Sequence, residues 1–135
     1  RELTRDDNNV KVVVYNGVML LCGQVRSEQL KQLAQSSAEG FAGVVRLVNE
    51  IEVTDEPEGF WRRRGDETIT AHVKTGLLDI TSMPGFDPTR INVTTSHRVV
   101  YLMGLVKHAE ADAATEVARN ANGVDKVVKL FDYID

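Results

Sequence analysis

The chain has 135 residues and a formal net charge of −4, with 42% hydrophobic and 27% charged residues. This composition is typical of one ordinary globular domain or two very small ones, and it argues against a disordered chain. The acidic balance excludes a broad basic surface for nucleic acid, the lack of 18 consecutive apolar residues excludes a transmembrane helix, and the single cysteine excludes an internal disulfide framework.

Residues 10–25 predict a β-hairpin. Valines alternate with other residues from position 10 to position 14, which is strand spacing. Asn16-Gly17 is the strongest short hairpin signal, because a type I′ turn needs positive φ at both central residues. Cys22 lies within the apolar second half of the hairpin and is expected to be a buried hydrophobe.

A helix is predicted after this hairpin, with Ser27 as its N-cap. Its apolar residues fall at helical spacing and form an expected inward stripe: Leu30, Leu33, Ala34, Ala38 and Phe41. Gly43 fits the end of the helix. Residues 45–53 then predict a third strand.

Residues 55–65 are predicted to form a linker, and a second helix is expected to follow with Asp66 as its cap. Apolar residues at helical spacing mark its buried stripe: Ile69, Val73 and Leu77. Gly76 is expected to weaken the last turn. The segment 83–88, rich in proline and glycine, breaks the chain.

Residues 91–106 repeat the hairpin pattern, and Gly104 matches Gly23 at an offset of about 80 residues. Arg98 stands where Gly17 stands in the first copy. Because positive φ is costly for arginine, a longer or differently shaped turn is expected here. A helix with an alanine-rich inward stripe and a strand over 126–134 complete the second copy.

The pattern therefore predicts an α+β fold made of two αββαβ units. In each, an antiparallel hairpin and a right-handed crossover to a parallel third strand give a three-stranded mixed sheet, covered by helices on one face. We expect a first domain over 1–54, a linker over 55–65 and a second domain over 66–135. The first unit is expected to lack most of its first helix, because only nine residues precede its first strand.

This ordered set of elements resembles the BON domain of bacterial periplasmic proteins. The residues that carry the resemblance are the second halves of both hairpins, the alanine-rich helix, the Gly-Val pair and the apolar last strand: Leu20-Leu21-Cys22-Gly23, residues 101–106, residues 113–121, Gly123-Val124 and residues 126–134. Two such units joined by a short linker resemble the dual-BON outer-membrane lipoproteins associated with cell division and envelope stress. The resemblance covers nearly the whole chain.

The resemblance implies a non-enzymatic periplasmic protein without a cofactor. It implies a place at the inner leaflet of the outer membrane, with a lipid anchor on a cysteine outside this sequence. It also implies peripheral binding to anionic phospholipid, of the phosphatidylglycerol type, through the first helix of the second unit and its flanking loop. On that helix the expected contact residues are Thr68, Ala71, His72 and Thr75. Relatives carry a tryptophan where this chain has Thr68.

The segment Phe60-Trp61-Arg62-Arg63-Arg64 is the most informative local motif. Its two aromatic rings suit a membrane interface. Its three guanidinium groups suit phosphates, and each is worth about 1 kcal/mol near an anionic surface. The alternative is a linker in which Trp61 packs between the two units while the arginines pair with nearby acids: Asp55, Glu56 and Glu58.

Other classes of function have weaker support. The three histidines are scattered at His72, His97 and His108, so no metal-ligand spacing is present, and no motif for a nucleophile or a phosphate loop occurs. We therefore expect neither a catalytic nor a metal site. The arginine run is too short for a nucleic-acid track. Two alternatives stay open: an adaptor for envelope proteins that accepts a partner at a strand edge, and a soluble periplasmic BON protein of the osmotic-stress type.

Overall fold

The computed structural model describes residues 9–55, 60–80 and 84–135, and of Asn9 and residues 60–64 it describes the backbone only. The chain divides into two compact units, residues 1–63 and 64–135. In the described part of the chain no helix has the length and hydropathy needed to cross a membrane.

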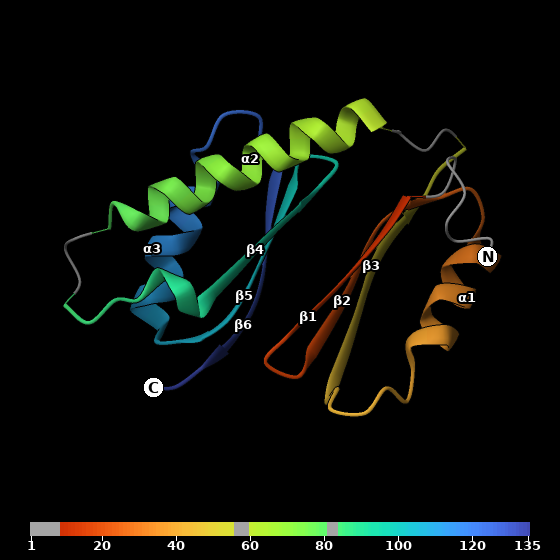
Figure 1. Ribbon diagram of the computed structural model, residues 1–135, viewed down its shortest axis with the longest axis horizontal. Helices are drawn as coiled ribbons and strands as arrows, with labels where there is room; N and C mark the ends of the chain where they lie inside the picture. The colour runs from red at the N-terminus through yellow and green to blue at the C-terminus, as the bar shows by residue number, and fades with distance from the viewer. Residues whose placement is uncertain (1–8, 56–59, 81–83) are drawn as a thin grey trace. The chain divides into compact units, whose positions relative to one another are not determined.

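In its described residues the first unit is a three-stranded mixed sheet with one helix (Figure 1). The antiparallel hairpin of β1 and β2 is followed by α1, and β3 pairs parallel to β2, so that β2 is the central strand. The elements are β1 (Asn9–Tyr15), β2 (Val18–Val25), α1 (Glu28–Ala38) and β3 (Arg46–Val53).

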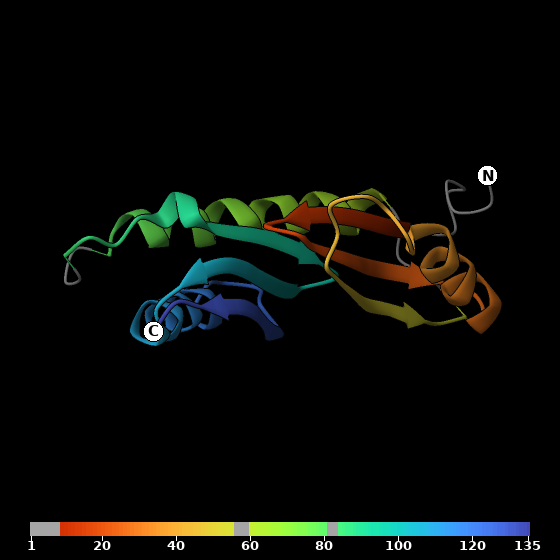
Figure 2. The ribbon, with the colours of Figure 1, turned by 90° about the horizontal axis from the view of Figure 1, so that it is seen from below.

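The second unit repeats this arrangement and adds a long helix before the hairpin (Figures 1 and 2). β4 and β5 are antiparallel, β6 is parallel to β5, and β5 is the central strand. The elements are α2 (Phe60–Leu78), the 3-10 helix η2 (Pro88–Arg90), β4 (Ile91–Ser96), β5 (Val99–Val106), α3 (His108–Arg119) and β6 (Lys126–Tyr133). The predicted α+β class with two mixed sheets is confirmed. The predicted shortening of the first helix of the first unit concerns residues before Asn9, which lie outside the described residues.

Each unit has its own apolar core on the helix-covered face of its sheet. In the first unit the core joins β2, α1 and β3: Met19, Leu21, Val25, Ala34, Ala38 and Ile51. In the second unit α2 adds a whole further layer of side chains, and the core includes Ile69, Val73, Leu77, Ile91, Val93, Val100, Leu102, Val106, Ala111, Ala114, Ala118 and Phe131. The second core is therefore the larger one.

The same strand position is covered in one unit and open in the other. Val93 of β4 is 5% exposed in the core that α2 helps to form, whereas Val12, at the matching position of β1, is 58% exposed. An apolar groove of about 220 Å³ lies beside Val12, lined also by Val10, Met19, Leu21, Ala34, Ser37, Ala38 and Phe41. In the described part of the first unit no helix corresponds to α2.

Helix α1 begins as predicted but buries a narrower stripe than predicted. The side-chain oxygen of Ser27 accepts a hydrogen bond of 3.2 Å from the backbone N–H of Leu30, which confirms the N-cap. Leu33 and Phe41, expected to point inward, are 41% and 60% exposed. Phe41 lies beyond the end of the helix, and no second helix stands on this face in the described part of the unit to cover either residue.

The predicted start of the second helix is wrong. α2 begins at Phe60, so residues 60–65 of the predicted linker are helical. Asp66 is therefore an interior helical residue and not an N-cap. Its side chain is buried, and the two carboxylate oxygens accept hydrogen bonds from the backbone N–H groups of His97 and Arg98, at 2.7 and 3.0 Å.

The prediction of a longer or differently shaped turn in the second hairpin is also wrong. Ser96 pairs with Val99, so the turn has only two residues, His97 and Arg98, both at positive φ (53° and 66°). This is the geometry that Asn16 and Gly17 adopt in the first hairpin. The turn forms without glycine because Asp66 holds both of its backbone N–H groups.

Candidate functional site

One face of helix α2 packs against the core of the second unit. Ile69, Val73 and Leu77, spaced four residues apart, are buried in the core. Polar contacts also join the same helix to the hairpin. The carboxylate of Asp66 accepts hydrogen bonds from the backbone of the turn, and the hydroxyl of Thr70 donates to that of Thr95 at 2.7 Å. The opposite face of α2 is therefore held outward on a fixed support.

Gly76 sets the spacing between α2 and α3. A Cβ atom built on Gly76 would lie 2.6 Å from Cγ1 of Val117 on α3, which is closer than real Cβ contacts come. Val117 is β-branched and has little freedom to turn away. The glycine expected to weaken the helix thus lets two helices approach closely.

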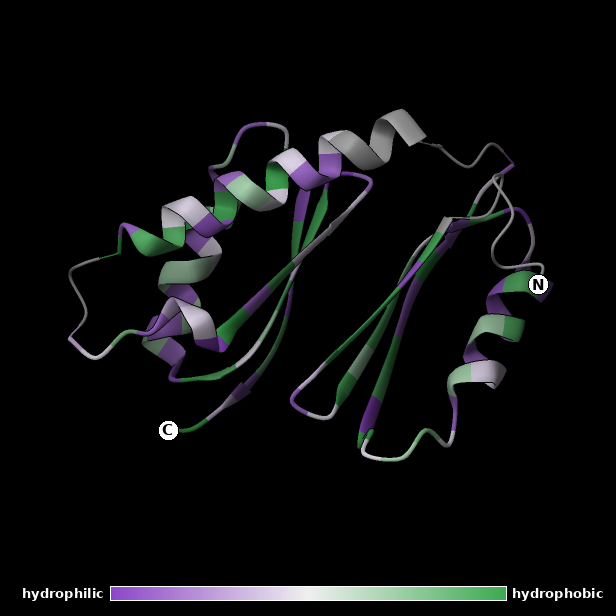
Figure 3. Cartoon of the chain, in the orientation of Figure 1, coloured by the Kyte–Doolittle hydropathy of each residue, from purple (hydrophilic) through white to green (hydrophobic). Residues whose placement is uncertain are grey.

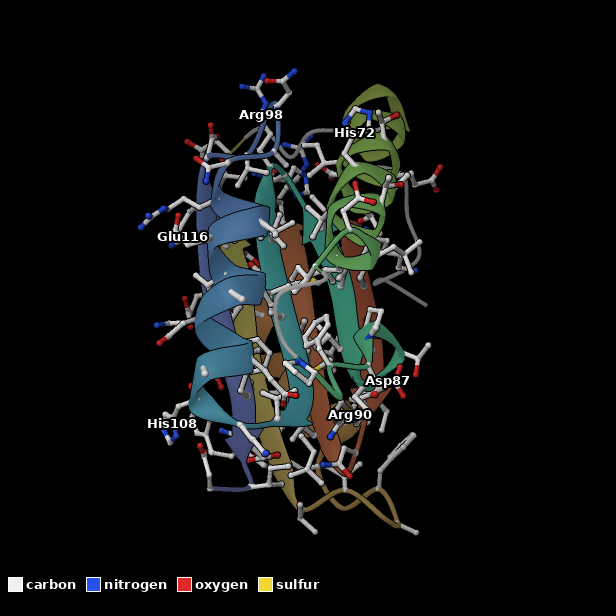
Figure 4. The ribbon with its side chains drawn as sticks, turned by 90° about the vertical axis from the view of Figure 1, so that its left-hand side faces the viewer. His72, Asp87, Arg90, Arg98, His108 and Glu116 are labelled. Atoms are coloured by element: carbon white, nitrogen blue, oxygen red, sulfur yellow. The ribbon has the colours of Figure 1, made fainter. Side chains whose placement is uncertain are left out.

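The four residues predicted on this helix lie together on its outward face. Thr68, Ala71, His72 and Thr75 are all exposed, and their spacing places them on one side of the helix. The hydropathy colouring of Figure 3 alternates along α2 between hydrophobic and hydrophilic positions. Figure 4 shows His72 toward the end of the sheet where Arg98 lies.

The remaining predicted residues precede this face on the same helix. The backbone of Phe60, Trp61, Arg62, Arg63 and Arg64 forms the first turns of α2. Their side chains lie outside the described residues, as do Glu56 and Glu58, two of the three acids named as alternative partners for the arginines.

A polar groove of about 500 Å³ lies between α2 and the end of α3. It combines an imidazole, a hydroxyl, a carboxylate and two amides with small apolar groups: His72, Thr75, Gly76, Asp79, Val117, Asn120, Ala121 and Asn122. Such a lining suits hydrogen bonding to hydroxyl groups. The structure therefore connects His72 and Thr75 to this groove, while Thr68 and Ala71 are not among its lining residues.

An apolar pocket of about 340 Å³ lies beside the last turns of α2, and sequence reasoning missed it. Its lining comes from α2, η2 and the start of β4: Lys74, Leu77, Leu78, Pro88, Thr89 and Ile91. Leu78 is 67% exposed. The signal in the sequence is the pair Leu77-Leu78, because neighbouring residues of a helix cannot both face the core.

The outer wall of this pocket is a fixed structure. The carboxylate of Asp87 accepts from the backbone N–H of Thr89 at 3.0 Å and from its hydroxyl at 2.6 Å, which caps η2. These hydrogen bonds from Thr89 lower the pKa of Asp87. Arg90 donates to the carbonyl of Gly85 at 3.2 Å and lies 3.6 Å from the carboxylate of Glu110. Figure 4 shows Asp87 and Arg90 at the end of the sheet away from Arg98.

The other candidate groups are structural. Cys22 is buried within β2. His108 lies 2.9 Å from the carboxylate of Asp135 and stacks on Tyr133, and its hydrogen bonds lower the pKa of Asp135. Among the described residues no group of three histidine, cysteine or acidic side chains is arranged to hold a metal ion.

Comparison with known proteins identifies the repeated unit. The family model described as "BON domain" matches residues 1–55 and 65–135. The chain is 37% identical over 130 residues to the 21 kDa hemolysin of Actinobacillus pleuropneumoniae, an alignment that covers 96% of this chain and 65% of the relative. It is 33% identical over 129 residues to the outer membrane lipoprotein DolP of Haemophilus influenzae, with 96% and 65% covered.

A third relative is the osmotically-inducible protein Y of Escherichia coli. It is 30% identical over 129 residues, and the alignment covers 90% of this chain and 63% of the relative. The chain thus spans a little under two thirds of the length of these curated relatives.

Proposed function

The chain belongs to the BON-domain family as a tandem of two such domains, and on that basis we propose that it is a bacterial envelope protein that binds anionic phospholipid through α2. The role proposed is binding without catalysis and without a cofactor. The relative DolP is named as an outer membrane lipoprotein. We propose that this protein too lies in the periplasm, at the inner leaflet of the outer membrane, and that a lipid anchor outside this sequence attaches it.

The observation that carries the proposal is the fixed outward face of α2. A helix binds at a membrane interface through an exposed face and through cations that meet anionic headgroups. The core residues and the Asp66 hydrogen bonds supply the fixed support for that face. Phe60, Trp61 and the three arginines belong to the first turns of the same helix, ahead of Thr68.

Local charge favours an anionic lipid in spite of the net charge of −4. The arginines at 62, 63 and 64 and Lys74 all belong to α2. Each cation near an anionic surface contributes about 1 kcal/mol, so the three arginines contribute about 3 kcal/mol. Phosphatidylglycerol carries the negative charge that this segment would meet.

Cosedimentation with vesicles tests the proposal. The wild-type protein should bind phosphatidylglycerol vesicles and leave phosphatidylcholine vesicles unbound. The triple variant Arg62→Gln, Arg63→Gln, Arg64→Gln should bind the anionic vesicles about 100-fold more weakly. The matched control removes three charges elsewhere, by Lys31→Gln, Lys126→Gln and Lys129→Gln, and should bind like the wild type. Equal, negligible sedimentation of the wild type with both lipids would refute lipid binding, and equal losses in both triple variants would refute this site.

One observation in the first unit favours a second role as a protein adaptor. β1 is an edge strand of the described sheet, and its exposed side chains include Val12 and Val14. An apolar edge of this kind can accept a partner strand. Crosslinking that recovers one stoichiometric partner, and that Val12→Lys abolishes without changing vesicle binding, is the expected result if the first unit acts in this way.

A further inference from the structure

We propose that the pocket beside the last turns of α2 receives one acyl chain of an anionic phospholipid whose phosphate pairs with Lys74. The inference rests on the proposed lipid binding and extends it, because it assigns a binding role to side chains that the outward polar face does not include. The pocket is lined by Lys74, Leu77, Leu78, Pro88, Thr89 and Ile91.

The floor and wall of the pocket are chemically suited to a hydrocarbon chain. Leu77 and Ile91 form part of the buried core, so the floor is apolar. Pro88 has no backbone N–H to leave unsatisfied. Thr89 already donates both its N–H and its hydroxyl to Asp87, so its donors are engaged outside the pocket. The lining thus offers apolar contact with few polar groups to desolvate.

The pocket adjoins the face of α2 that is proposed to meet the membrane, because its lining residue Leu78 lies at the edge of that face. Leu78 follows Thr75 by three residues and Ala71 by seven, which is the spacing of one helical face. Its side chain is largely exposed although it is apolar. Contiguous exposed apolar surface rimmed by polar residues marks an interaction site, and Leu78 continues the apolar lining of the pocket to the surface. An acyl chain leaving the bilayer would reach the pocket from this side.

Lys74 supplies the charge that selects an anionic lipid. It precedes Leu78 by one helical turn, on the same side of α2. In the described part of the chain no carboxylate forms a salt bridge with it. Its long apolar stem can line the pocket while the ammonium group stays at the water interface. The pocket therefore combines a positive charge with an apolar lining, which matches the phosphate and the acyl chain of a phospholipid.

The pocket at Leu78 differs in its lining from the polar groove, and this difference favours an acyl chain as its occupant over a headgroup. The groove on the α3 side of the helix contains the carboxylate of Asp79 and the amides of Asn120 and Asn122. That lining favours hydroxyl groups, whereas the pocket at Leu78 presents mainly hydrocarbon. A phospholipid has both parts, and α2 separates the two environments.

Methyl NMR with soluble ligands tests the pocket directly. The probe is dihexanoyl phosphatidylglycerol below its micelle concentration, with glycerol 3-phosphate as the headgroup control. The short-chain lipid should shift the methyl signals of Leu77, Leu78 and Ile91, and the headgroup alone should leave them in place. Unchanged methyl signals with the lipid would overturn the proposal, as would equal shifts with the headgroup alone.

Two variants with matched controls test the same pocket on vesicles. Leu78→Asn should weaken binding to phosphatidylglycerol vesicles about tenfold, whereas Leu33→Asn, a partly exposed leucine of α1, should not. Lys74→Gln should weaken binding about fivefold and reduce its salt dependence, whereas Lys31→Gln should do neither. Binding by Leu78→Asn equal to that of Leu33→Asn contradicts the pocket.

The outcomes separate this inference from the proposed function. If the wild type binds anionic vesicles but the pocket methyls and the Leu78→Asn variant show no effect, the pocket proposal is wrong and lipid binding stands. If vesicles are not bound but the short-chain lipid shifts the pocket methyls, the pocket stands and membrane docking is wrong. Absence of both effects overturns both proposals.

Discussion

The buried carboxylate of Asp66 determines the shape of a turn that lies 31 residues away in the chain. His97 and Arg98 both adopt positive φ, at a cost of about 1–2 kcal/mol each for residues with side chains. The two hydrogen bonds from their backbone N–H groups to Asp66 offset that cost. Because these bonds also join α2 to the hairpin, the same residue positions the helix of the candidate site.

Replacing Asp66 by alanine should destabilise the protein by about 2–4 kcal/mol, because two backbone N–H groups lose a charged acceptor. Urea denaturation measures the change. Asp112→Ala, at an exposed position of α3, is the control and should change stability by less than about 0.5 kcal/mol. Adding Arg98→Gly to Asp66→Ala should recover part of the loss, since glycine adopts positive φ without strain. No recovery would mean that Asp66 does not stabilise the protein by offsetting the strain of this turn.

The pKa of Asp87 gives a prediction about pH. Its pKa is lowered by the hydrogen bonds from Thr89, so its stabilising effect is complete above the unfolded-state pKa of about 3.9. The effect is lost as the pH falls through the lower folded-state pKa. The melting temperature of Asp87→Asn should therefore lie below that of the wild type at pH 7, and the difference should begin to shrink as the pH falls below about 4. A constant difference down to pH 2 would contradict this assignment.

At the scale of the element, α2 is defined by its neighbours more than by its own propensities. Two glycines interrupt it, Gly65 and Gly76, and in isolation each would cost about 1 kcal/mol relative to alanine. They differ in their surroundings. Open space surrounds Gly65, whereas Val117 of α3 lies directly over Gly76. Packing against α3 therefore explains the glycine at position 76, and nothing in the structure explains the glycine at position 65.

The two glycines should respond to alanine in opposite ways. Gly65→Ala should stabilise the protein by up to about 1 kcal/mol, through helix propensity alone. Gly76→Ala should destabilise it by about 1–3 kcal/mol, because the added methyl group overlaps Val117. Thermal unfolding of both variants measures the difference. Stabilisation by Gly76→Ala would show that α2 and α3 can separate freely, and it would weaken the view of α2 as a fixed support.

At the scale of the whole molecule, one sequence pattern is used twice with different outcomes. The matching valines at 12 and 93 lie on the helix side of their sheets, yet only the second is covered, because α2 packs over it. The first unit instead presents an apolar groove. The two units therefore share their three strands and the helix before the last strand, but they differ in the surface that they expose.

This difference predicts unequal mutational costs. Val93→Ala should destabilise the protein by about 2 kcal/mol, because it removes buried methyl groups from a packed core. Val12→Ala, the same change at the matching exposed position, should cost less than about 0.5 kcal/mol. Chemical denaturation of both variants tests the comparison. Equal costs would mean that Val12 is covered in solution, and the groove would then be a filled site.

Much of the candidate site follows from spacing. Thr68, Ala71, His72 and Thr75 lie together as predicted, because the buried stripe of α2 fixes which residues face outward. Leu78 and Lys74 were not predicted, since the role proposed for them depends on a pocket wall supplied by η2, ten or more residues later in the chain. The helix start at Phe60 escaped prediction as well, because Asp66 looks like a cap when its distant partners are not known.

By itself the sequence determined the duplication, the class of fold and the order and pairing of the strands, because these depend on local periods of two and 3.6 residues and on turn residues. The tertiary structure determined which groups each side chain contacts. The hydrogen bonds of Asp66, the contact of Gly76 with Val117 and the pocket at Leu78 all join segments distant in the chain. Such contacts depend on how elements pack, and no local pattern encodes them.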